Sequence, residues 1–113
     1  MAALTTNVVP LAGLRTDNLF TAAAAGGDNC ATGAGVLLLV KNGDAASHTV
    51  TLATPQTFDG DLALEDRAVA VAAGQDAAIP VTDRYRDPST GRCSITYDAV
   101  TSVTVAVIRT AAS

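Results

Sequence analysis

The sequence predicts an all-β domain, either an antiparallel β-sandwich or a small barrel of about seven to eight short strands. The first observation is a two-residue alternation of apolar and polar side chains, which is clearest over 93–97 and 103–109. Side chains two positions apart in a strand share one face, so this alternation is typical of strands with a buried face. The second observation is that turn-forming residues recur roughly every ten residues. The third is that no segment shows a convincing helical period.

Each expected strand lies between turn-forming residues. Val36–Val40 is a continuous apolar run that follows Gly35, which is typical of a strand buried on both faces or of a central strand in a sandwich. The pair Asn42-Gly43 predicts a turn with positive φ, so residues 36–54 are expected to form a β-hairpin. The expected strands are 19–22, 36–40, 47–54, 68–72, 77–81, 93–97 and 103–109.

The remaining segments are expected to be connections. Residues 1–18 have no sustained period and are expected to form an extended N-terminal arm, followed by a single β-sandwich domain over 19–113. Residues 23–35 contain four glycines and are expected to form a long flexible loop. Residues 55–66 and 83–92 are polar and turn-rich.

Composition excludes several classes of function. The chain has 113 residues, a formal net charge of −4, and one lysine and six arginines that are scattered. Direct binding to nucleic acid needs clustered positive charge, so it is not expected. No apolar run approaches the roughly 20 residues of a membrane helix, and no secretory signal is visible, so synthesis in the cytoplasm is expected.

Residue types that carry chemistry are sparse. His48 is the only histidine and is expected to be a surface or strand-end residue, with no elbow motif around a nucleophile. The acidic run from Asp59 to Asp66 fits a solvated loop better than a calcium site. We therefore predict no enzyme activity, no catalytic residue, no cofactor and no metal.

Two cysteines, Cys30 and Cys93, are far apart in the sequence. A disulfide between them would close a long loop and stabilise the fold by about 4 kcal/mol. The absence of a secretory signal favours reduced thiols. Both states remain open, with reduced thiols favoured.

Two segments are candidates for partner binding. Arg84, Tyr85 and Arg86 concentrate side chains that are favoured at protein interfaces, although an exposed loop without a partner is the simpler interpretation. The arm can dock by adding a strand to a neighbouring sheet. Its candidate contact residues are Val8, Val9, Pro10, Leu11 and Leu14.

Four blocks, in order along the chain, resemble one family: 7–11 (NVVPL), 20–28 (FTAAAAGGD), 40–43 (VKNG) and 97–107 (YDAVTSVTVAV). They resemble small head decoration or minor capsid proteins of tailed bacteriophages, particularly those of actinobacteria. The blocks are turns and strands, not catalytic motifs.

The resemblance implies a non-enzymatic virion protein that binds the outside of the capsid and stabilises it. The implied partners are the major capsid protein and other copies of the chain, with a trimer as one option, and assembly takes place in the host cytoplasm. A neck or tail component is the alternative. A carbohydrate-binding adhesion module is a weaker one, because only four aromatic residues are present.

Overall fold

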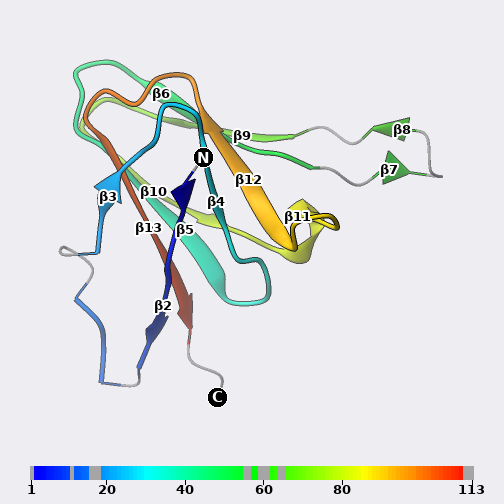
Figure 1. Cartoon of the computed structure of the whole chain (residues 1–113). Helices are drawn as coiled ribbons and strands as arrows, with labels where there is room; N and C mark the ends of the chain where they lie inside the picture. The colour runs from blue at the N-terminus through cyan, green and yellow to red at the C-terminus, as the bar shows by residue number, and fades with distance from the viewer. Residues whose placement is uncertain are drawn as a thin grey trace.

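The computed structural model describes residues 2–10, 12–15, 19–54, 57–58, 62–63 and 66–110. These residues form two facing β-sheets and a separate small two-stranded sheet (Figure 1). The predicted all-β class is confirmed, and the two sheets do not close into a barrel. No helix in the described residues is long and apolar enough to cross a membrane.

The first sheet has the strand order β1-β4-β12-β6-β9, with β11 paired to β12. All of its pairs are antiparallel except β1 with β4. The strands are β1 (Ala2–Ala3), β4 (Asp28–Cys30), β6 (His48–Leu52), β9 (Arg67–Val71), β11 (Arg86–Asp87) and β12 (Arg92–Tyr97).

The second sheet has the order β10-β5-β13-β2, with β3 paired to β13. Its β2–β13 pair is parallel. The strands are β2 (Thr6–Val9), β3 (Thr21–Ala22), β5 (Val36–Asn42), β10 (Asp76–Pro80) and β13 (Val103–Thr110). The small sheet pairs β7 (Thr57–Phe58) with β8 (Leu62–Ala63), and a short 3₁₀ turn, η1, spans Asp83–Tyr85.

Thirteen strands are described, more than predicted, because six of them are only two or three residues long. Segments this short cannot display a two-residue alternation. The two parallel pairs also make both sheets mixed instead of purely antiparallel.

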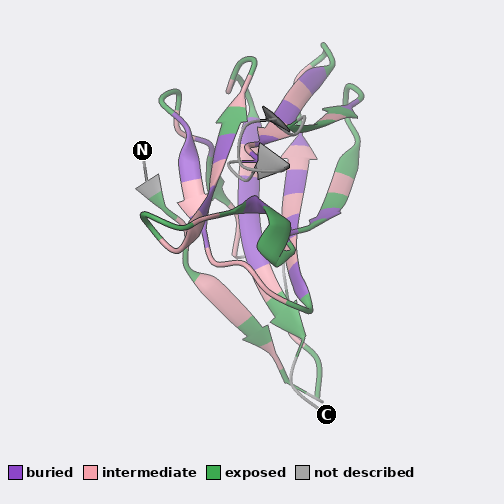
Figure 2. Cartoon of the chain, turned by 90° about the vertical axis from the view of Figure 1, so that its right-hand side faces the viewer, coloured by how far each residue is buried: buried purple, intermediate pink, exposed green. Residues whose placement is uncertain are grey.

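The core lies between the two sheets (Figure 2). In β5 and β6 every second residue is buried, as the alternation over 47–54 predicted for β6; β5, expected from its continuous apolar run, is buried on one face and half-buried on the other. The largest fully buried side chains are aliphatic, among them Leu38, Leu52 and Ile95. Thin Val, Ile and Leu side chains therefore form this core, with Tyr85 its only aromatic member among the buried residues that the structure describes.

Connections mostly cross from one sheet to the other. The hairpin predicted over 36–54 is wrong, because β5 belongs to the second sheet and β6 to the first. Instead, β6 runs through the β7–β8 pair and returns as β9, which makes one long hairpin whose tip projects from the sandwich (Figure 1). A turn sequence alone cannot distinguish a hairpin from a crossing between sheets.

The turn after β5 is held by the side chain of Asn42, not by a residue with positive φ. Asn42 Nδ2 donates to Ala46 O and Val71 O, both at 2.9 Å, and its Oδ1 accepts from Asp44 N at 3.0 Å. Neither Asn42 nor Gly43 has positive φ, so that part of the turn prediction is wrong. The buried amide ties the turn to the end of β9.

Residues 2–9, expected to form an arm outside the domain, are extended but belong to both sheets. β1 pairs with β4, and β2 pairs with β13. Their partners lie 26 residues away for β1 and 101 residues away for β2, which no local pattern reveals.

The loop expected over 23–35 is also interrupted by a strand, because β4 pairs with β12 and buries Asp28 and Cys30. Gly33 and Gly35 then turn the chain toward the second sheet with φ of +140° and +79°. A Cβ on Gly35 would also collide with Thr110 Oγ1, so a side chain there is doubly disfavoured.

Candidate partner-binding cleft

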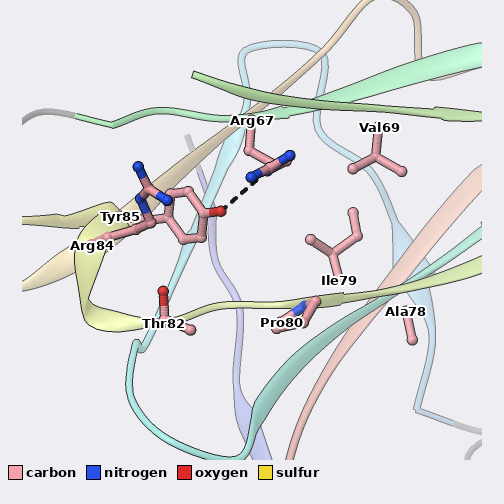
Figure 3. Close-up of a pocket in the computed structure, with 8 residues that line it drawn as sticks. All are labelled: Arg67, Val69, Ala78, Ile79, Pro80, Thr82, Arg84 and Tyr85. Atoms are coloured by element: carbon pink, nitrogen blue, oxygen red, sulfur yellow. Dashed lines mark hydrogen bonds between the residues drawn. The ribbon is translucent and has the colours of Figure 1, made fainter. Parts of the chain in front are cut away.

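Two edge strands, β9 and β10, lie on the same side of the sandwich, and a cleft of about 440 Å³ opens between them (Figure 3). Val69 of β9 and Ile79 of β10 point toward each other across it. Ala78, Pro80 and Thr82 complete the second wall. We call the two edge strands β9 and β10, together with the cleft between them, the seam.

Two arginines stand at one end of the cleft, on either side of Tyr85 (Figure 3). Arg67 Nε donates to Tyr85 Oη at 3.4 Å, and the Arg84 guanidinium lies 6.0 Å from the centre of the Tyr85 ring. Tyr85 itself is only 6% exposed. The buried tyrosine therefore serves as a fixed support that positions both guanidinium groups.

The turn that carries Arg84 and Tyr85 is tied to its neighbours. Tyr85 N donates to Thr82 O at 3.2 Å within the 3₁₀ turn, and Gly33 N donates to Val81 O at 3.0 Å just before it. Thr32 Oγ1 donates to Asp83 Oδ1 at 2.9 Å. These bonds hold the turn against the segment between β4 and β5.

The charge in the cleft is one-sided. Its lining consists of the two arginines, Thr82, Tyr85 and apolar side chains, with no carboxylate. Asp66 is next to Arg67 in the sequence, but its Oδ1 accepts from Thr54 N at 2.8 Å. An anionic group is therefore the chemical complement of this end of the cleft.

A second polar cluster lies at the start of β6, where His48 is buried with 7% of its surface exposed. Its Nε2 lies 2.8 Å from Asp44 Oδ2 and its Nδ1 lies 3.2 Å from Asp98 Oδ1. The hydrogen bond with Asp44 raises the pKa of His48, against the opposing effect of burial. Both ring nitrogens are engaged, so His48 links two turns and has no nitrogen left for a substrate.

A third cluster lies within the first sheet. Asp28 is fully buried, and its Oδ2 accepts from Tyr97 Oη at 2.6 Å and from Ala24 N at 3.3 Å, while Oδ1 has no partner. Cys30 and Cys93 are directly opposite each other on β4 and β12, both fully buried and both free thiols. The hydrogen bond with Cys30, together with burial, raises the pKa of the Cys93 thiol.

None of these clusters is arranged as a metal site. The described residues contain no group of three or more His, Cys, Asp or Glu side chains that could hold a metal ion. Residues 59–61 and 64–65 of the predicted acidic run lie outside the described part of the chain.

The structure separates the two predicted binding segments. Val8 is 46% exposed on β2, Val9 is half-buried and Pro10 exposed, while Leu14 is half-buried. Leu11 lies outside the described residues. In this sandwich β2 is the edge strand opposite β10, so these residues and the seam are on different sides of the molecule.

The loop predicted at Arg84, Tyr85 and Arg86 is only partly a surface. Arg84 lines the cleft, Tyr85 is buried beneath it, and Arg86 is exposed in β11 outside the cleft lining. Sequence reasoning missed Arg67, which is far from Arg84 along the chain. The sequence marks Arg67 only weakly, as an arginine that directly follows the acidic run and begins a strand.

Comparisons with protein-family models, with characterised proteins and with solved structures find no match to this chain.

Proposed function

We propose that this chain is a non-enzymatic structural protein of a tailed-phage virion, which binds the outside of the capsid as a head decoration protein and stabilises it. Its partners are the major capsid protein and other copies of the chain. The proposal starts from the sequence blocks that resemble such proteins. It concerns attachment, for which a fold needs contact surfaces and no active site.

The observation that carries the proposal is the seam. Two sheet edges and a cleft with two arginines lie together there, and strand edges, arginine and apolar side chains are the groups by which folded proteins recognise other chains. The exposed Val8 of β2 and the exposed Pro10 that follows it offer a second contact surface on the other side. A subunit with contact surfaces on two sides can bridge neighbours in a lattice.

The aromatic residues give little support to the carbohydrate-binding alternative. Sugar-binding modules present flat aromatic rings to solvent. Of the aromatic side chains that the structure describes, Tyr85 is buried, Tyr97 is half-buried and bonded to Asp28, and Phe20 is half-buried with Lys41 Nζ 4.6 Å from its ring centre. A neck or tail position remains the alternative for the same fold.

The test is cosedimentation of purified protein with capsids assembled without it, followed by a count of copies per particle. Saturation at hundreds of copies is the expected result for a decoration protein. A dozen copies or fewer would assign the chain to a vertex, neck or tail, and no binding would overturn the proposal.

A further inference from the structure

The free main-chain groups of β9 can be located from the hydrogen bonds of its neighbour. Ala53 N donates to Ser94 O at 3.0 Å and Asp98 N donates to Thr49 O at 3.1 Å, so the odd-numbered residues of β6 bond to β12. In an antiparallel ladder successive residues bond to opposite sides. The even-numbered residues of β6 therefore bond to β9 through its residues 67, 69 and 71, in the observed register.

Ala68 and Ala70 of β9 consequently direct their N–H and C=O groups away from β6, toward the open edge of the sheet. Both residues are exposed, and their methyl side chains leave room for a neighbouring strand. An edge of this kind is a template for another extended chain. Arg67 and Val69 face the cleft from the same strand.

The edge of β10 is less suitable. Asn42 N donates to Gln75 O at 3.0 Å and Val81 N donates to Val36 O at 2.9 Å, so residues 75, 77, 79 and 81 face β5. The outward positions then include Asp76 and Pro80. Proline has no N–H to offer, and proline and charge are common ways of protecting an edge strand. Of the two edges at the seam, β9 is therefore the receptive one.

The positive charge of the cleft indicates which side chain an added strand would place there. A strand added beside β9 directs every second side chain toward the cleft, next to Arg67 and Val69. Arg67 Nε donates to Tyr85 Oη, and the Arg84 guanidinium lies over the face of the same ring. The cleft lining contains no carboxylate. A carboxylate on the added strand supplies the missing anion, and neighbouring apolar side chains fit between Val69 and Ile79.

We infer that β9 binds an extended segment of a partner protein as an added strand, with an aspartate or glutamate of that segment held between Arg67 and Arg84. The inference rests on the proposed function only in naming the major capsid protein as the source of this segment. The recognition itself is independent of that source.

The probe is an acetylated, amidated pentapeptide of alternating threonine and valine with a central aspartate, compared with the same peptide containing asparagine. Binding is followed by amide chemical shifts of the full chain in solution. We expect the largest shifts at Ala68 and Ala70, and about tenfold weaker binding of the asparagine peptide because the charge-assisted bonds are lost. Equal binding of both peptides, or the absence of shifts at β9, would overturn the inference.

Two alanines provide a matched pair for the main-chain contact. Ala70→Pro removes an outward N–H from β9, and Ala78→Pro removes an outward N–H from β10; both residues are exposed on edge strands. We expect Ala70→Pro to weaken peptide binding at least tenfold and Ala78→Pro to change it less than twofold. Similar effects of the two variants would contradict addition at β9, and the amide spectrum of each variant shows whether it is folded.

The arginines are tested in the same way. Arg67→Gln combined with Arg84→Gln is expected to remove the preference for aspartate, whereas Arg86→Gln, outside the cleft lining, leaves it in place.

If wild-type protein binds capsids and the Ala70→Pro variant binds them equally, the cleft assignment fails while the decoration role stands. If sedimentation shows an oligomer that Ala70→Pro dissociates, the occupant is a second copy, and the inferred partner is wrong.

Discussion

The two sides of the sandwich end in different ways. On one side the N-terminal residues supply both edge strands, β1 of the first sheet and β2 of the second, and each pairs in parallel with its neighbour. On the other side β9 and β10 end their sheets without a further strand in the described part of the chain, and a cleft opens between them. The two sides therefore differ in how the edge strands are supplied and in what lies beside them: on the β9–β10 side the edges flank a cleft lined by two arginines, where a partner can bind.

The largest expected difference between the two sides concerns packing, and two isoleucines test it. Ile95 is fully buried in β12, the middle strand of the first sheet, whereas Ile79 is buried in the edge strand β10 and also lines the cleft. Ile95→Ala leaves an enclosed cavity and should cost about 4 kcal/mol of unfolding free energy, while Ile79→Ala extends a space already open to solvent and should cost about 2 kcal/mol. Urea denaturation measures both free energies of unfolding; equal costs would mean that Ile79 beside the cleft is packed as tightly as Ile95 in the middle of the sheet.

Removal of residues 1–9 tests whether the N-terminal strands are structural. Leu4 packs against the core, Leu4 N donates to Asn29 O at 2.8 Å, and Asn7 Nδ2 donates to Val107 O at 3.1 Å. We expect the deletion to lower the unfolding free energy by about 3 kcal/mol, from lost burial and lost hydrogen bonds.

The matched control for this deletion is Arg67→Gln with Arg84→Gln, which changes exposed charges on the opposite side and should cost less than about 1 kcal/mol. A deletion without effect on thermal unfolding would return these residues to the role of a free arm. Loss of capsid binding by the deleted protein therefore identifies a docking arm only when the remaining domain is shown to be folded.

The smallest expected effect is a pH dependence at His48, away from both edges. Its pKa is raised in the folded state, chiefly by the hydrogen bond with Asp44, so the stability it contributes is present below its unfolded pKa of about 6.5 and is lost as pH rises through the folded value. The pKa of Asp44 is lowered by the same bond, so the carboxylate contribution is lost only at acidic pH, as pH falls through its folded value.

Urea denaturation of wild type and His48→Gln between pH 5.5 and 7.5 measures the difference. Wild type should lose stability toward pH 7.5, and the variant should show a flat profile over this range because His48 is the only histidine. A parallel slope in the variant would assign the pH dependence to another group.

The sequence predicted features that depend on neighbouring residues better than features that depend on residues distant in the chain. The continuous apolar run Val36–Val40 and the alternation over Ser47–Thr54 correctly located β5 and β6, because both patterns are properties of neighbouring residues. Which sheet each strand joins is decided by partners distant in the sequence, so the predicted hairpin over 36–54 was wrong. Strand β4 was missed because Asp28 and Asn29 have low strand propensity, and pairing with β12 overrides it.

The cleft shows the same limit. Arg84 and Tyr85 were singled out because they are adjacent in the sequence, but Arg67 joins them only because β9 and β10 lie on the same side of the sandwich. Burial of Tyr85 was equally invisible, since its loop is polar in sequence. The predicted contact residues from Val8 to Leu14 remain predictions; Val8 and Val9 lie in β2 and Pro10 directly follows it, whereas Leu11 lies outside the described residues.

The crossing of the chain between sheets also determines how the protein must acquire its structure. Apart from the long hairpin from β6 to β9, the principal pairings join segments distant in the sequence, such as β5 with β13 and β4 with β12. Each such pairing requires a large loop to close, and this closure costs conformational entropy before the strand contacts can offset it. Folds of this kind form in milliseconds to seconds. The β6–β9 hairpin is therefore the natural nucleus. The second sheet is completed only when β13 inserts between β5 and β2.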